Sequence, residues 1–383
     1  MLFHKLPSSP FSLFISLTIT SFGFLFFYQR FPDAPSLLNT FTYDAQMYLN
    51  MVNEIDVPGP HSCRILLPYL AKFLPFKPLQ SILIINIISF IALFYGLMKM
   101  LENFLINRSV IIFTLGIFFS TYCVAYNFTN PFLTDLPALA TMIFYINSII
   151  KLRFVSSLLW LGSSLLFRET AIVLVPLFFI TFSLKKSIFA SFLILLIYIV
   201  PKLIISGNFF CDFYSSISLK LLLDFEFLIK TILSYGALWI VGFFGFFSLK
   251  NYRKHLFKVA CSLLILSLLG SVLSSFKSVT DVTRMYFLVL PTLILGSALF
   301  IQRILIKKYS FLYLTVLLSA GFSLSIGFFP NILINGDFSS LKEFARSNFT
   351  IIIISALFQF FAIALLVKLD LTNYYSSQKK FKS

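Results

Sequence analysis

The chain has 383 residues, of which 59% are hydrophobic and only 11% are charged. Soluble globular domains carry roughly 25% charged residues, so this composition excludes a water-soluble enzyme, and it also excludes intrinsic disorder, which requires low hydrophobicity. The net charge of +16 would suit a nucleic-acid partner in a soluble protein, but in a membrane protein Lys and Arg gather in cytoplasmic loops. The composition therefore predicts an all-α, polytopic membrane protein.

A membrane-spanning helix needs about 20 mostly apolar residues, and about twelve segments meet or approach this length. The first segment resembles a signal peptide but lacks a small-x-small cleavage site, so we expect it to remain as an anchor. The segments at 154–167 and 170–184 are short and flank Arg168 and Glu169, so they form either two spans or a re-entrant hairpin. The predicted spans are 11–28, 79–98, 109–126, 132–150, 154–167, 170–184, 187–205, 228–248, 256–275, 285–301, 310–329 and 349–368.

Basic residues are distributed unevenly between the two sides that these spans define. With a cytoplasmic N-terminus, the inner connections and the span ends next to them hold 18 of the 30 Lys and Arg residues but only two of the 14 Asp and Glu residues. This asymmetry follows the positive-inside rule and accounts for the net charge without a nucleic-acid partner. We expect a multi-pass protein of the plasma (inner) membrane with both termini in the cytoplasm.

No internal repeat is evident and no linker separates a soluble domain, so residues 1–383 are expected to form a single transmembrane domain. Its outer loops are 29–78, 206–227 and 330–348. In the first of them, apolar positions recur at helical spacing after Tyr43, and 65–74 form a second apolar stretch that Pro68 is expected to break. Both stretches are predicted to be short amphipathic helices at the outer membrane interface.

The first outer loop carries the first candidate functional residues. The segment YDAQMY contains Tyr43, Asp44 and Tyr48, and the segment HSCRILLP contains His61 and Arg64. An exposed loop carboxylate is usually only solvated, but here an arginine follows it, just before an apolar stretch. A guanidinium can hold a phosphate through two parallel hydrogen bonds, where Lys offers only a point charge. The loop thus combines a candidate base with a candidate phosphate ligand.

Two further groups of candidates lie at the ends of predicted spans. Asp135, in NPFLTDLP, stands where a span begins. Two compatible roles are open: helix capping, by Thr134 or by Asp135 itself, and function at the membrane surface. Arg168 and Glu169 form either a structural ion pair or part of a polar cavity. Because charges are costly in a membrane, Arg168 is expected to point into the same cavity as Asp44 and Asp135.

The segment DVTR adds Asp281 and Arg284 at the mouth of a late span, where a positive interfacial anchor is the alternative explanation. Together the segments place two carboxylates and three arginines on one side of the membrane. A carboxylate can deprotonate an acceptor hydroxyl, and arginines can bind a phosphate leaving group. The carboxylates are Asp44 and Asp135, and the arginines are Arg64, Arg168 and Arg284.

In these segments the sequence resembles bacterial membrane glycosyltransferases of the GT-C fold. The resemblance rests on YDAQMY…CRILLPYLA, NPFLTDLPALA, LLFRETAIVLVPL and DVTRMYFLVLP, and it covers most of 40–300. It implies transfer of a sugar from a polyprenyl-phosphate carrier to a glycan, lipid or protein acceptor outside the cytoplasm, as in cell-envelope glycan biosynthesis. The catalytic acid of that family typically lies in the first outer loop, which is the position of Asp44. In many members a second acid follows directly, where this chain has Ala45.

The resulting hypothesis is an inverting glycosyl transfer with Asp44 as general base. Asp135 is the expected second catalytic carboxylate, a role that Glu54, Asp56 and Glu169 could also fill. Donor phosphate is assigned to Arg64, Arg168 and Arg284, and supporting roles to Tyr43, Tyr48, His61, Glu169 and Asp281.

No cofactor is expected, with a divalent metal left as an open alternative. The four Cys and three His residues show no zinc-ligand spacing. The competing functions are an O-antigen-type polymerase or ligase, a lipid or glycan transporter, and a non-catalytic assembly subunit.

Overall fold

The computed structural model describes residues 43–55, 57, 61, 64–119, 133–206, 235, 238–247, 249, 253–275 and 286–305. These ranges contain helices, turns and connecting segments and no strand, so the expected all-α fold is confirmed for this part of the chain. The predicted spans 11–28, 310–329 and 349–368 lie outside the described residues, as does the outer loop 330–348 and nearly all of the outer loop 206–227.

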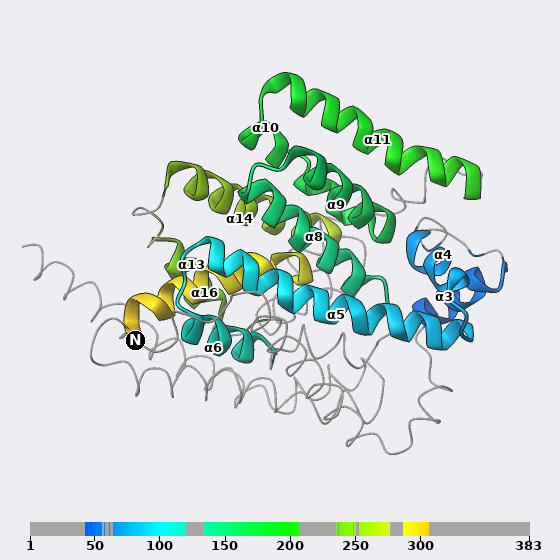
Figure 1. The fold of residues 1–383 in the computed structure, drawn as a ribbon, viewed down its shortest axis with the longest axis horizontal. Helices are drawn as coiled ribbons and strands as arrows, with labels where there is room; N and C mark the ends of the chain where they lie inside the picture. Colours follow the sequence, from blue (N-terminus) through cyan, green and yellow to red (C-terminus); the bar gives the residue numbers. More distant parts are fainter. Residues whose placement is uncertain are drawn as a thin grey trace, which may run out of the picture.

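The described helices follow the predicted apolar segments (Figure 1). The segment predicted at 154–167 is one helix with those bounds, and the segment at 170–184 is divided into a 3-10 helix and a short α-helix. The elements are α3 (Tyr43–Val52), α4 (Leu66–Phe73), α5 (Pro78–Asn103), α6 (Arg108–Phe119), α8 (Asp135–Ile150), α9 (Phe154–Phe167), η3 (Glu169–Leu174), α10 (Leu177–Thr181), α11 (Leu184–Ser206), α13 (Leu238–Phe246), α14 (Lys254–Ser275), η6 (Tyr286–Val289) and α16 (Leu290–Leu305).

Among the described residues, three helices are long and apolar enough to cross a membrane, judged by length and composition. They are Pro78–Asn103 in α5, Leu184–Pro201 in α11 and Lys254–Val272 in α14. Large apolar side chains such as Ile188 and Phe192 are exposed along α11, an arrangement that suits contact with lipid tails. These helices indicate a membrane protein, whereas the total of about twelve spans remains a prediction from the sequence.

Helix α8 is the centre of the described part, because it packs against both α5 and α9 (Figure 1). Its Asn147 side chain donates to the Gly96 carbonyl of α5 at 2.9 Å and accepts from Asn103 at 2.9 Å. Helices α13 and α16 form a second close pair, in which a Cβ added at Gly245 would collide with the carbonyl of Gly296. Lipid provides no hydrophobic driving force for helices to associate in a membrane. Hydrogen bonds between helices and close backbone contacts at small residues take its place.

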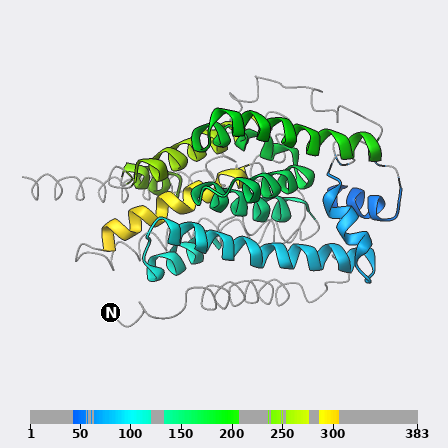
Figure 2. The ribbon, with the colours of Figure 1, turned by 45° about the horizontal axis from the view of Figure 1, so that its top comes forward.

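Helices α3 and α4 lie together beside the beginning of α5 (Figures 1 and 2). Their buried residues, Tyr48, Val52, Leu67 and Ala71, pack against α5, α8 and α9 in a small apolar cluster. The prediction that Pro68 breaks the second stretch is wrong. Pro68 is the third residue of α4, where the backbone N–H groups have no partner within the helix and a proline costs little.

Three helices end in the same way, on a residue with left-handed backbone that is not glycine. Glu54, Leu105 and Leu152 have φ of 62°, 56° and 56°. After α8, the N–H of Leu152 bonds the Ile149 carbonyl at 3.1 Å and the N–H of Arg153 bonds the Ser148 carbonyl at 2.9 Å. This pair of bonds is the Schellman motif, which satisfies the last carbonyls of a helix.

Candidate functional site

Six polar side chains form a buried group where α3 and α4 meet α8 and α9, and none of them exposes more than 6% of its surface. We call this group the charged cluster. Four of its members form two Arg–carboxylate pairs, which is unusual in a chain with so few charged residues. The members are Tyr48, Arg64, Thr134, Asp135, Arg168 and Glu169.

Arg64, just before α4, binds Glu169 at the start of η3 through two parallel hydrogen bonds. Its Nε donates to one carboxylate oxygen at 3.2 Å and a terminal nitrogen donates to the other at 3.0 Å. The second terminal nitrogen donates to the Tyr48 hydroxyl at 2.8 Å, and this hydroxyl lies 3.3 Å from the Thr134 hydroxyl. Arg64 therefore ties α3, α8 and η3 together through charge-assisted bonds.

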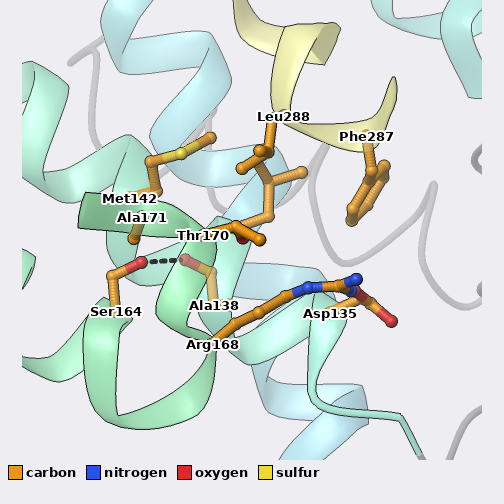
Figure 3. Close-up of a pocket in the computed structure, with 10 residues that line it drawn as sticks. Asp135, Ala138, Met142, Ser164, Arg168, Thr170, Ala171, Phe287 and Leu288 are labelled. Carbon is orange, nitrogen blue, oxygen red and sulfur yellow. Dashed lines mark hydrogen bonds and ion pairs between the residues drawn. The ribbon is translucent and has the colours of Figure 1, made fainter. Parts of the chain in front are cut away.

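Arg168 pairs with Asp135, the first residue of α8 (Figure 3). Helix α9 ends at Arg168 because this residue adopts an extended backbone with φ −158° and ψ 123°. Successive side chains of an extended backbone point in opposite directions, so Arg168 and the neighbouring Glu169 reach different partners. The expectation that Arg168 lies with Asp135 is confirmed, and its counterpart for Asp44 stays a prediction because the Asp44 side chain is outside the described part. Of the two alternatives for Arg168 and Glu169, an ion pair between them is replaced by two pairs with other segments.

A cavity of about 20 Å³ adjoins the Arg168–Asp135 pair, with room for about one water molecule. Arg168, Asp135 and Ser164 line its polar side, and the Ser164 hydroxyl donates to the Ala138 carbonyl at 2.9 Å (Figure 3). Phe287 of η6 lies on the opposite side of the cavity in the same view. Thr170 also lines the cavity, and its buried hydroxyl has no hydrogen-bond partner among the described residues.

The formal charges of the cluster cancel, with two arginines against two carboxylates. Removing a charge from water costs several kcal/mol even after the protein relaxes, and only close pairing and hydrogen bonds offset this cost. His61 is also buried and lies edge-on to Tyr48, with a ring-centroid distance of 5.6 Å. The sequence-predicted residues Tyr48, His61, Arg64, Asp135, Arg168 and Glu169 are therefore brought together.

The remaining sequence-predicted residues divide into two sets. Asp44 and Tyr43 belong to the first turn of α3, so Asp44 lies about one helical turn before Tyr48, but their side chains lie outside the described part. Asp56, Asp281 and Arg284 lie outside it entirely.

Glu54 is separate from the cluster and exposed at the end of α3, where it pairs with Lys72 of α4. The hydrogen bond and charge of Lys72 lower the pKa of the Glu54 carboxyl. Because Glu54 lies apart from the charged cluster, Asp135 and Glu169 are the described carboxylates of the cluster that could serve as the second catalytic carboxylate.

Of the two capping alternatives at the beginning of α8, the one through Thr134 is wrong. Thr134 occupies the N-cap position, but its side chain makes no capping hydrogen bond and lies instead beside the Tyr48 hydroxyl. Asp135 is buried against Arg168 because α9 packs on α8 at this level. Asp135 therefore has a partner from another helix, which the local sequence does not reveal.

Sequence reasoning missed two polar residues of the site, Ser164 and Thr170. Both lie within five residues of Arg168 in a mostly apolar segment. That proximity was the available signal, but Ser and Thr are common in membrane helices and carry no charge to draw attention.

No three His, Cys, Asp or Glu side chains are grouped so that they could hold a metal ion in the part of the chain that the structure describes. Comparisons with family models, with curated proteins and with solved structures find no match to this chain.

Proposed function

We propose that the protein is a membrane glycosyltransferase that moves a sugar from a polyprenyl-phosphate carrier to an acceptor on the extracytoplasmic face of the plasma (inner) membrane. About twelve spans and a GT-C-like arrangement belong to the same proposal. The observation that carries it is the meeting of Arg64 and Arg168 in one buried cluster beside the helix that carries Asp44. Ionisable groups buried in membrane proteins usually mark a functional site.

The proposed reaction uses these groups in defined roles. The Asp44 carboxylate takes the proton of an acceptor hydroxyl, and the acceptor oxygen attacks the anomeric carbon of the sugar. The bond from that carbon to the phosphate oxygen breaks with inversion, and the polyprenyl phosphate leaves with the electron pair. Arg64 and Arg168, with Arg284 from the sequence prediction, stabilise the negative charge that gathers on the leaving phosphate.

The test is sugar transfer in membranes that contain the protein, with a panel of radiolabelled polyprenyl-phosphate sugars as donors. Asp44→Asn removes the base and keeps the size of the side chain, so turnover should fall by roughly 10²–10⁴-fold at equal expression. Glu54→Gln is the matched control, because it changes an exposed carboxylate near the other end of the same helix. Wild-type turnover by Asp44→Asn would contradict the mechanism, and no transfer from any donor would contradict the function.

A second variant separates binding from chemistry. Arg64→Lys keeps the charge but loses the paired donors that can hold a phosphate. We expect the donor KM to rise more than kcat falls. If the protein is a transporter or an assembly subunit, neither the wild type nor the two variants will transfer sugar.

A further inference from the structure

We propose that Glu169 occupies the place of a ligand phosphate on Arg64, and that Glu169 takes up one proton when a polyprenyl phosphodiester displaces it. This inference rests on the proposed function and adds to it a proton-coupled mode of donor binding. It concerns Arg64 and Glu169 as a unit, because both of them are buried and paired with each other.

The geometry of the pair is that of a phosphate site already filled. The two parallel bonds from Arg64 to the Glu169 oxygens, at 3.2 and 3.0 Å, are those that a guanidinium makes equally well to two phosphate oxygens. The third bond, to the Tyr48 hydroxyl at 2.8 Å, does not involve the carboxylate and can persist when the carboxylate is displaced. Thr170, next to Glu169, adds a buried hydroxyl with no partner in the described ranges.

The space available supports exchange over simple addition. The adjoining cavity has about 20 Å³, which is room for a water molecule and not for a phosphate. Arg64 and Glu169 do not line this cavity. A phosphate that binds Arg64 through the same two donors must therefore take the position of the group already bound there, which is the Glu169 carboxylate.

Charge balance then requires a proton. The cluster of described residues is neutral, with Arg64 and Arg168 against Asp135 and Glu169. A phosphodiester brings one negative charge into this buried space, and an uncompensated buried charge is costly. Glu169, displaced from its cation and close to the new anion, relieves this cost by binding a proton.

The neighbours of Glu169 leave few other groups to take that proton. Arg168 and Tyr198 of α11 are close enough to act on it electrostatically, but neither type of side chain ordinarily titrates between about pH 6 and pH 8. Helix α14 packs on η3, and its contact lies around Gly270, next to Val173. Residues 259–275 of α14 contain no Asp, Glu, Lys, Arg or His, so this helix offers none of these groups for the proton. Asp135, His61 and Asp44, the proposed base on α3, are the remaining alternatives. The first two have their own variants below, and Asp44→Asn tests the third.

The experiment measures binding of a synthetic phosphodiester, methyl farnesyl phosphate, to the full chain in detergent. This probe carries a single negative charge throughout the range from about pH 6 to pH 8, so any pH dependence comes from the protein. We expect wild-type affinity to fall about tenfold per pH unit as pH rises, as uptake of one proton requires. Calorimetry in two buffers of different ionisation enthalpy should show directly that about one proton is bound per probe.

Variants of the candidate residues identify the group that binds the proton. Glu169→Gln should bind the probe more tightly than wild type, with the pH dependence gone, whereas Asp135→Asn and His61→Gln should retain it. Glu102→Gln, in the Lys99–Glu102 pair of α5, is the control and should behave as wild type. Because Glu169→Gln could impair folding, the wild-type proton count stands as an independent measurement. Dimethyl phosphate, with the same charge and no lipid tail, should bind far more weakly.

The outcomes separate this inference from the proposed function. Binding of the probe with no proton uptake overturns the inference and leaves glycosyl transfer standing. The inference is also overturned if Asp135→Asn or His61→Gln loses the pH dependence of probe binding while Glu169→Gln retains it. Equal binding of dimethyl phosphate overturns the lipid assignment, and failure of the probe to bind at any pH overturns both the inference and a lipid-phosphate substrate.

Discussion

Arg64 and Glu169 lie 105 residues apart in the chain and face each other through two hydrogen bonds inside the protein. The pair links the segment before α4 to the junction of α9 and η3. Its partner pair, Arg168 with Asp135, links that junction to the beginning of α8. The segment and the two helices are thus held together by charge at the point where the sequence places its candidate catalytic acid.

The first prediction concerns the contribution of this pair to stability. Arg64→Met leaves Glu169 buried without its cation and should lower the free energy of unfolding by about 3–5 kcal/mol. Arg64→Met combined with Glu169→Met removes both charges and should recover most of that loss, because an apolar pair of similar size needs no compensation. The measurement is thermal unfolding in detergent at constant pH.

The matched control is the half-buried Lys99–Glu102 pair of α5. Each of its single variants should cost about 0.5 kcal/mol, as expected for a pair within one helix. If the Arg64/Glu169 double variant is as unstable as the single one, the cost comes from packing and not from the unpaired charge.

The second prediction separates a binding hydroxyl from a merely buried one. Thr170 and Thr114 both have buried hydroxyls without a hydrogen-bond partner among the residues described. Thr→Val removes an unsatisfied polar group at nearly constant volume, so both variants should be as stable as wild type or more stable by about 1 kcal/mol. Only Thr170→Val should reduce sugar transfer, because Thr170 lines the cavity beside Arg168. Equal activity of the two variants would exclude a role for the Thr170 hydroxyl.

The third prediction concerns the left-handed helix ends. Leu152 has a φ of 56° and is 55% exposed. This left-handed backbone conformation costs about 1–2 kcal/mol for a residue that has a Cβ. Leu152→Gly should therefore raise the apparent unfolding temperature. Leu159→Gly is the matched control, since Leu159 is 61% exposed within α9, and there glycine should destabilise by about 1 kcal/mol. Similar effects of both changes would contradict the assignment of strain to Leu152.

The fourth prediction tests the orientation derived from the charges. In a variant whose only cysteine is Cys63, a membrane-impermeant thiol reagent applied to intact cells should label the protein. A variant with its only cysteine placed within 250–258 should be labelled only after the membrane is opened. The expectation follows from the positive-inside rule, and labelling of the second variant alone in intact cells would reverse the orientation.

The sequence predicted the helices well where charge or backbone chemistry marks their ends. Helix α9 has the predicted bounds because Arg153 precedes it and Arg168 follows it. The division of 170–184 into η3 and α10 was not predicted, although Pro176, which stands at the beginning of α10, is the one proline of that segment. Hydrophobicity alone does not distinguish a 3-10 turn from an α-helical one.

The pairing within the site was beyond sequence reasoning for a different cause. Arg168 and Glu169 are adjacent, so a local ion pair was a reasonable expectation, and Asp135 had an equally local explanation as a cap. The packing of α9 on α8, and of α4 on α5, decides otherwise. Which carboxylate meets which arginine depends on those contacts, and a single sequence contains no measure of them.

The long separation between Arg64 and Glu169 has a consequence for synthesis of the chain. At roughly 5–20 residues per second, the ribosome needs about 5–20 seconds to add the residues that separate them, and during that time Arg64 lacks the carboxylate that later receives it. In the predicted topology, the first outer loop waits in water while the spans that follow it enter the bilayer. Its docking is therefore a late event in biogenesis, and nascent chains that stop before η3 should leave this loop open to added protease.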